Sequence, residues 1–326
     1  MKSLLSFALI LFSSLSLAQD STFYPFQNGN LKVPNLGSKE SLECVGCNFT
    51  QPAFVKKMFN RQGDFHGPNC YNTALITAGV MKLNQVRYVS PEEFEALLKL
   101  NFAPKSSASA GDVIVFDAQS SRGHAAYYLG DNLVFHKKSY GTYYHYRIAP
   151  IENVGVVEKK EWTPNPFEGS IAQFNWPELG KLPKAFYKAS KKSISYDPRF
   201  ARVLTTLEPI LLNDFGQWAV AKRWGLVGKG LIEDYLKLIV PQADALTKGM
   251  LISFRDQLQL YFDEVHFKNA RNYDRVTEEV CLPEDKAQLF QVYQFLAKSL
   301  GRSDAELKTR WDKVLSQDKK RCRERL

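Results

Sequence analysis

The stretch Gly123–Lys138, GHAAYYLGDNLVFHKK, decides the fold because it reads as two short strands joined by a tight turn. Aromatic and β-branched residues fill both arms, as is typical of strands. Between them, Gly130-Asp131-Asn132 has the composition of a three-residue hairpin loop. The sequence therefore predicts an antiparallel hairpin at the centre of the first half of the chain.

The register of this hairpin places two histidines together. With a three-residue loop, Leu129 pairs with Leu133 and Ala126 lies opposite His136. His136 is then diagonal to His124 on one face, within side-chain reach. A two-residue loop would put the two imidazoles on opposite faces, so the loop length decides whether they can act together.

The elements around the hairpin predict an α+β domain. Asn69 can cap a helix that begins after Pro68, and Ser90-Pro91-Glu92-Glu93 is a capping box with proline in the first turn. We expect helices at 69–83 and 90–100, and further strands at 112–117 and 143–148. Helices followed by a run of antiparallel strands are typical of the α+β class.

Changes in composition and hydrophobic pattern along the chain predict further divisions. We expect a signal peptide at 1–18, an extended segment at 19–51, a catalytic domain at 52–160, a Pro-rich linker at 161–198 and an all-α domain at 199–326. The signal peptide rests on Lys2, the apolar run Leu4–Leu17 and the small-x-small site ending at Ala18. The mature protein is therefore expected to be periplasmic or secreted, without a membrane span.

An exported chain with five cysteines is expected to pair most of them. Cys44 and Cys47 can close a small loop, and Cys281 and Cys322 can staple a C-terminal helical segment. A metal or redox role for Cys44 and Cys47 is the alternative, although no second ligand pair at zinc spacing accompanies them. Cys70 remains as the odd thiol.

Cys70 has the placement of a nucleophile. It opens the helix predicted at 69–83, where the helix dipole and free N–H groups favour a thiolate. A nucleophile needs a base, and the base needs a group that fixes its orientation. We expect His124 as the base, His136 as the orienting group, and an ion pair of thiolate and imidazolium with a bell-shaped pH profile.

The order of these motifs resembles the NlpC/P60 family over residues 52–160. The matching motifs are Gly67-Pro68-Asn69-Cys70, then Ala110–Phe116, then Gly123–Gly130 and Val134-Phe135-His136. The resemblance implies a papain-like fold that cuts peptidoglycan stem peptides without metal or cofactor, with Cys70, His124 and His136 as the catalytic residues.

Two residues depart from the family, which usually has Asp before and Ser after the cysteine. Asn69 and Tyr71 occupy those positions, and they affect substrate choice more than the reaction. Together with His66 and Tyr128 they are our candidates for lining the substrate cleft.

The resemblance implies peptidoglycan as the partner, and the formal net charge of +9 is compatible with this or another anionic wall polymer. The basic residues are scattered, and we expect no nucleic acid. Alternatives remain a CHAP-like amidase, a secreted thiol protease with a non-wall substrate, and an inactive protein that binds the wall or a partner.

Overall fold

The computed structural model describes residues 21–36, 38–63, 67–117, 123–141, 144–154, 179–190, 193–200 and 240–268, with separate positions between 204 and 316. The chain forms two compact units, Met1–Thr50 and Gln51–Leu326. The predicted signal peptide lies outside the described residues.

The first unit contains a three-stranded antiparallel sheet where the sequence predicted only an extended segment. Its strands are β1 (Ser21–Phe26), β2 (Gly29–Pro34) and β3 (Glu43–Val45), in that order. Gln27 and Asn28 both have positive φ and make the two-residue turn between β1 and β2. The turn signals at 27–30 mark a hairpin within the segment that the sequence predicted as extended.

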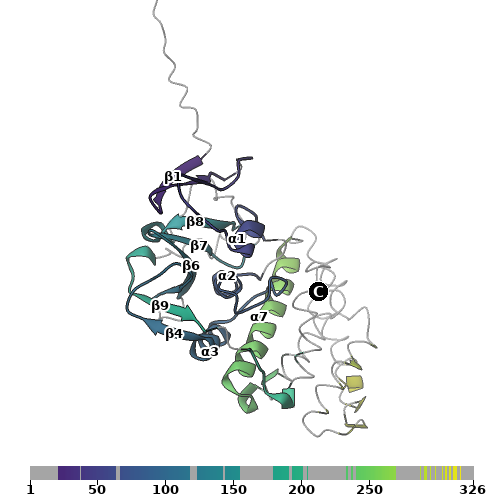
Figure 1. Cartoon of the computed structure of the whole chain (residues 1–326). Helices are drawn as coiled ribbons and strands as arrows, with labels where there is room; N and C mark the ends of the chain where they lie inside the picture. Colours follow the sequence, from purple (N-terminus) through teal and green to yellow (C-terminus); the bar gives the residue numbers. More distant parts are fainter. Residues whose placement is uncertain are drawn as a thin grey trace, which may run out of the picture. The chain divides into compact units, whose positions relative to one another are not determined.

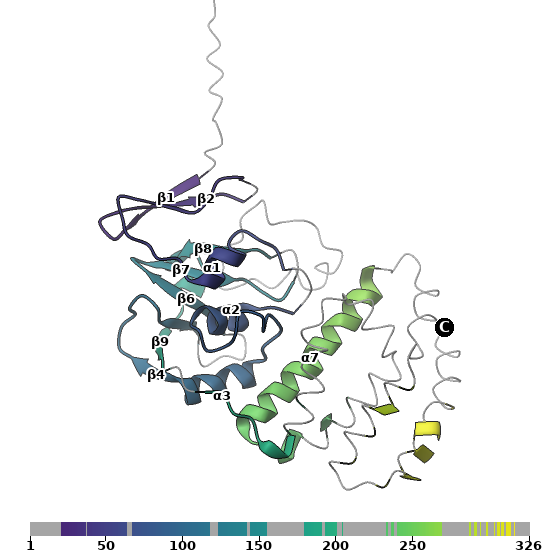
Figure 2. The same ribbon diagram turned by 45° about the vertical axis from the view of Figure 1, so that its right-hand side comes forward.

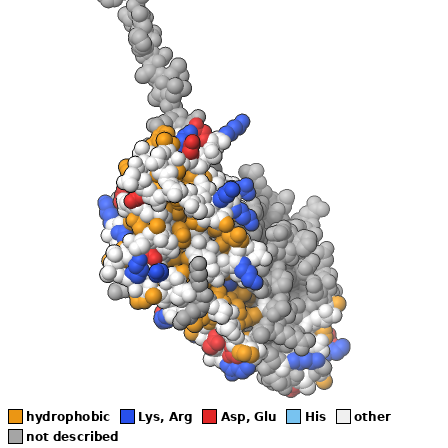
Figure 3. Space-filling view, viewed as in Figure 1, with side chains coloured by type: hydrophobic (Ala, Val, Ile, Leu, Met, Phe, Trp, Pro, Cys, Tyr) orange, Lys and Arg blue, Asp and Glu red, His pale blue; other side chains and the backbone are white. Residues whose placement is uncertain are grey.

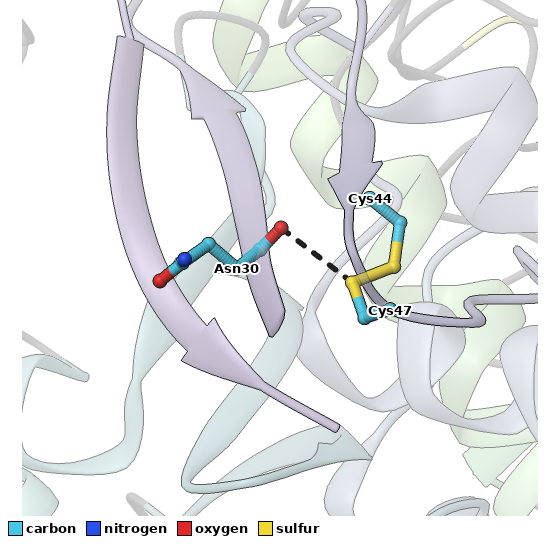
Figure 4. The surroundings of a disulfide bond; sticks show 3 residues. All are labelled: Asn30, Cys44 and Cys47. Atoms are coloured by element: carbon cyan, nitrogen blue, oxygen red, sulfur yellow. Dashed lines mark hydrogen bonds between the residues drawn. A yellow bond between two sulfur atoms is a disulfide. The ribbon is translucent and has the colours of Figure 1, made fainter. Parts of the chain in front are cut away.

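The predicted disulfide between Cys44 and Cys47 is present in this unit (Figure 4). It closes a three-residue separation at the end of β3. The Cys47 sulfur lies 3.5 Å from the carbonyl oxygen of Asn30 in β2. Cys281 and Cys322 lie outside the described residues.

The second unit is built on a six-stranded sheet in the order β4-β9-β5-β6-β7-β8, with every neighbouring pair antiparallel (Figure 1). The strands are β4 (Phe102–Lys105), β5 (Val113–Phe116), β6 (His124–Gly130), β7 (Leu133–Lys137), β8 (Tyr146–Pro150) and β9 (Lys184–Ala189). The α+β class is therefore confirmed, and four of the strands coincide with predicted ones.

Strand β9 lies inside the segment predicted as a linker at 161–198. It pairs with β4 on one side and β5 on the other, and Phe186 lies opposite Ile114. The flanking prolines suggested a strap without regular structure, and they hid a six-residue strand. This part of the segment belongs to the sheet.

Helices cover one face of the sheet. They are α1 (Ala53–Met58), α2 (Cys70–Thr77) and α3 (Pro91–Asn101). Phe54 of α1 meets Phe135 and Tyr146 edge to face. The other face carries a buried cluster of apolar side chains, Ile114, Phe116, Ala126, Val134, Val154 and Leu179.

The two helices expected from the sequence are both present. Asn69 caps α2, which ends at Thr77, six residues earlier than predicted, because Gly79 adopts a positive φ of 74°. Ser90 caps α3, and its hydroxyl accepts from the backbone N–H of Glu93 as the capping box requires.

The hairpin register was predicted correctly for the histidines but for the wrong reason. The loop has two residues, Asp131 and Asn132, and Gly130 pairs with Leu133, so the predicted pairing of Leu129 is wrong. A β-bulge between Tyr128 and Gly130 inserts one extra residue in β6. The bulge offsets the shorter loop and keeps both imidazoles on one face.

Helix α7 (Ala245–Lys268) runs beside α3 (Figure 2). Their backbones come close at Gly249, where an added Cβ would collide with the backbone of Glu93. The described part of the predicted C-terminal domain thus belongs to the same compact unit as the sheet. The all-α nature of 199–326 stays a prediction.

Within the described residues, no helix combines the length and apolar character that a membrane crossing requires.

Candidate active site

Cys70 is the first residue of α2, and the turn before it is held by the side chain of Asn69. The Asn69 Oδ1 accepts from the N–H of Asn72 at 3.1 Å, and its Nδ2 donates to the carbonyl of Val89 at 2.7 Å. A capping residue satisfies N–H groups that the first helical turn leaves free. Asn69, a candidate for the substrate cleft, is therefore a buried helix cap.

The two predicted histidines are in contact. The Nε2 of His124 lies 3.1 Å from the Nδ1 of His136, and the rings are nearly perpendicular. Both side chains are buried. The Nδ1 of His124 is buried and has no hydrogen-bond partner within the described part of the chain.

The Cys70–Tyr71 turn contacts β6 on both sides of His124. The Tyr71 hydroxyl donates to the carbonyl of Gly123 at 2.7 Å. Hydrogen bonding to the backbone of Ala125 lowers the pKa of the Cys70 thiol in part. The residue before His124 and the residue after it thus both face the cysteine turn.

The structure does not join the thiol to an imidazole directly. No hydrogen bond links the Cys70 sulfur to His124 or His136, all three of which are described. Side chains alternate along a strand, so His124 shares the face of Phe116, whereas Ala125 faces the helices. Attack with His124 as base requires the sulfur and the ring to approach each other.

Burial keeps the resting site uncharged. It raises the pKa of Cys70 to about 11, outweighing the backbone amides and Lys137, which favour the thiolate. It lowers the pKa of His124 to about 3, with a further contribution from Lys138. It also lowers the pKa of His136, where His124 and Arg147 add to the effect. The expected ion pair is therefore disfavoured in the free protein.

Lys137 is a buried lysine that the sequence did not single out. Its Nζ donates to the carbonyls of Ser139 and Gly141, and burial lowers its pKa to about 7, although the nearby Cys70 raises it. The loop that it holds also accepts a hydrogen bond from the N–H of Gly67 at the carbonyl of Tyr140. A lysine next to a predicted catalytic histidine was the available signal.

The pH dependence of alkylation at Cys70 should report the raised pKa of its thiol. Only the thiolate reacts, so a pKa of about 11 predicts that the iodoacetamide rate at Cys70 rises about tenfold per pH unit from 7 to 10. Peptide mapping by mass spectrometry separates Cys70 from the other cysteines. A rate that already levels off near neutral pH would instead reveal a thiolate stabilised in the resting protein.

The remaining cleft candidates have structural contacts. The ring of Tyr71 stacks on Phe94 of α3 with ring centroids 4.3 Å apart. Tyr128 packs against the buried apolar cluster, and its hydroxyl accepts from the backbone of Asn132 in the hairpin loop. His66 lies outside the described residues. Tyr71 and Tyr128 thus support the scaffold of the site.

A cavity of about 580 Å³ lies at the C-terminal end of α2, lined in part by Ile76, Tyr127 and Lys188, and the lining contains none of the three predicted catalytic residues. Among the described residues, no cluster of three or more His, Cys, Asp or Glu could hold a metal ion.

Lysine and arginine side chains are scattered over the visible face rather than gathered in one patch (Figure 3).

No family model matches the sequence, and no curated protein or solved structure is significantly similar to it.

Proposed function

We propose that the chain is an exported cysteine hydrolase with a papain-like domain of the NlpC/P60 type. Its substrate would be an amide bond in the stem peptides of peptidoglycan. Cys70 is the nucleophile, His124 the base and His136 the group that orients it. No cofactor enters the reaction.

The observation that carries this proposal is that Cys70 and Tyr71 contact the residues directly before and after His124. Tyr71 bonds to the residue before His124, and Cys70 faces the amide of the residue after it. His124 meanwhile uses one ring nitrogen for His136, and the other has no partner among the residues that the structure describes. The contact between the two histidines fits a base and its orienting group, and the proposed reaction further requires the Cys70 sulfur to meet His124, to which it is not bonded at rest.

The N–H groups at the start of α2 supply a further requirement. The backbones of Cys70 and Tyr71 both favour negative charge at the sulfur. Donors at a helix N-terminus can equally stabilise the oxyanion that forms when a thiolate adds to an amide carbonyl. The same two residues can therefore serve the nucleophile and the intermediate.

Export is supported by two features of the chain. The first is the leader-like sequence of residues 1–18, and the second is the disulfide at Cys44 and Cys47. Disulfides persist in oxidising compartments and are rare in the cytoplasm. The wall polymer as partner rests on the net charge of +9 and on the family resemblance.

A second candidate function is a papain-like domain that binds wall peptides without cleaving them. The burial of Cys70 and His124, which are 7% and 1% exposed, favours it, because substrate must reach the sulfur for attack. Under this alternative, the pair of histidines is a buried structural contact.

Incubation of purified wall fragments with the wild type and with Cys70→Ala separates the two functions. We expect the wild type to release peptides, detected by mass spectrometry, and Cys70→Ala to reduce the release to the level of buffer. Thermal unfolding of the variant controls for folding. Equal release by both proteins, or none by either, would support the non-catalytic function.

A further inference from the structure

We propose that α7 positions the cysteine turn, with Gln257 and Ser253 holding the backbone segment Arg87–Ser90 against the start of α2. The two residues come from a part of the sequence more than 160 positions away from that segment. The inference rests on the proposed function only in taking Cys70 as the reactive group.

Gln257 makes the first contact. Its side chain is fully buried, and its Oε1 accepts from the N–H of Tyr88 at 2.7 Å. The same side chain fills the space beside Gly67, where an added Cβ would collide with the amide group. Gly67 has a φ of 140°, a value that suits glycine, and it lies three residues before Cys70.

Ser253 makes the second contact, one helical turn earlier on the same face of α7. Its hydroxyl accepts from the N–H of Ser90 at 2.8 Å and donates to Glu93 at 2.6 Å. The carbonyl of Gly249 accepts from the Ser90 hydroxyl. These groups are all buried, so each of them needs a hydrogen-bond partner within the protein.

The segment held by α7 in turn holds the cysteine turn. The side chain of Asn69 donates to the carbonyl of Val89. The Asn72 side chain accepts from the N–H of Arg87 at 3.3 Å and donates to the carbonyl of Gln85. The residues on either side of Cys70–Tyr71 are thus tied to a strip of backbone that α7 supports from its other side.

The polar character of these contacts argues for positioning. A helix that only covered a core could pack with apolar side chains, whereas each buried polar group here needs its partner and accepts a narrow range of geometries. Removal of the Gln257 acceptor leaves the N–H of the half-buried Tyr88 without this partner, which favours local opening of the 87–90 segment. The thiol of Cys70 should then become more accessible.

Alkylation of Cys70 in the full chain tests this inference, with Gln257→Leu and Ser253→Ala as the variants. Arg255→Gln on the exposed side of α7 is the matched control, since its side chain is 45% exposed. We expect both variants to be alkylated at least about fivefold faster than the control, as the loss of a hydrogen bond of about 1 kcal/mol implies.

Two readouts separate positioning from a general loss of stability. The midpoint of the pH profile at Cys70 should move from about 11 toward the ordinary thiol value of 9.0, because opening removes the burial that raises it. The faster rate should also be insensitive to low urea, which marks local opening, whereas global unfolding accelerates with denaturant.

Rates and pH profiles equal to those of Arg255→Gln would overturn the inference, as would acceleration that only follows the urea dependence of global unfolding. Ser253→Ala removes a single hydroxyl and keeps the test open if Gln257→Leu fails to fold. These measurements need no hydrolysis. If Cys70→Ala releases as much peptide as the wild type while Gln257→Leu shifts the thiol profile, the proposed function fails and the positioning role stands.

Discussion

Replacement of Glu93 by Ala is expected to lower the free energy of unfolding by about 3–5 kcal/mol. Glu93 and Arg87 form an ion pair in which both side chains are almost fully buried, at 0% and 1% exposure. Both guanidinium nitrogens Nη1 and Nη2 donate to the carboxylate, at 2.8 and 2.5 Å. Without the carboxylate, the Arg87 charge stays buried and loses this counter-ion, which is the costly situation for a buried pair.

Urea unfolding followed by circular dichroism measures this loss of stability. Two further variants test whether it comes from the buried charge. Glu95→Ala on the same helix breaks an exposed pair with Lys99 and should cost less than about 0.5 kcal/mol. The double variant Arg87→Met with Glu93→Leu should recover a large part of the stability, because it removes both charges. If Glu93→Ala lowers the free energy of unfolding no more than Glu95→Ala does, the prediction is wrong, and Arg87 must be hydrated or paired in another way in the variant.

The sequence predicted the parts of the site that depend on local periodicity. Strand alternation brought His124 and His136 to one face, and capping chemistry placed Cys70 at the start of α2. The hairpin shows the limit of such reasoning. The loop of Asp131 and Asn132 is one residue shorter than predicted, and only the bulge near Leu129 keeps the register.

Contacts between distant segments carried no local signal. Strand β9 lies among prolines, and its place between β4 and β5 depends on the whole sheet. Gln257 and Ser253 are unremarkable polar residues on a helix until α3 is packed against them. The pKa of Cys70 likewise follows from burial, which the sequence pattern around a helix N-terminus does not reveal. Tertiary packing decides these features.

Replacement of His124 by Ala is expected to lower kcat/KM for peptide release by about 10³-fold, the usual contribution of a general base. The structure gives the base an unusual starting point, because the thiol and the imidazole are both neutral at rest. In the proposed mechanism the sulfur and the ring first come together, the proton passes from Cys70 to His124 during attack, and the imidazolium that forms is stabilised by His136. His136→Ala should therefore reduce kcat/KM by a smaller factor, since base and nucleophile remain.

The pH profile of the wild type distinguishes this mechanism from a preformed ion pair. Activity is lost on the acid side only when His124 is protonated before attack, and its pKa of about 3 places that limb well below neutrality. Activity is lost on the alkaline side when the Cys70–His124 pair gives up its shared proton, near the Cys70 pKa of about 11. His124 and Cys70 therefore impose no limb between pH 5 and 9, and a change of kcat/KM within this range would come from Lys137, whose pKa burial lowers to about 7. A narrow bell centred near pH 6.5 would contradict the neutral resting state, because its limbs would require an exposed imidazole and a stabilised thiolate.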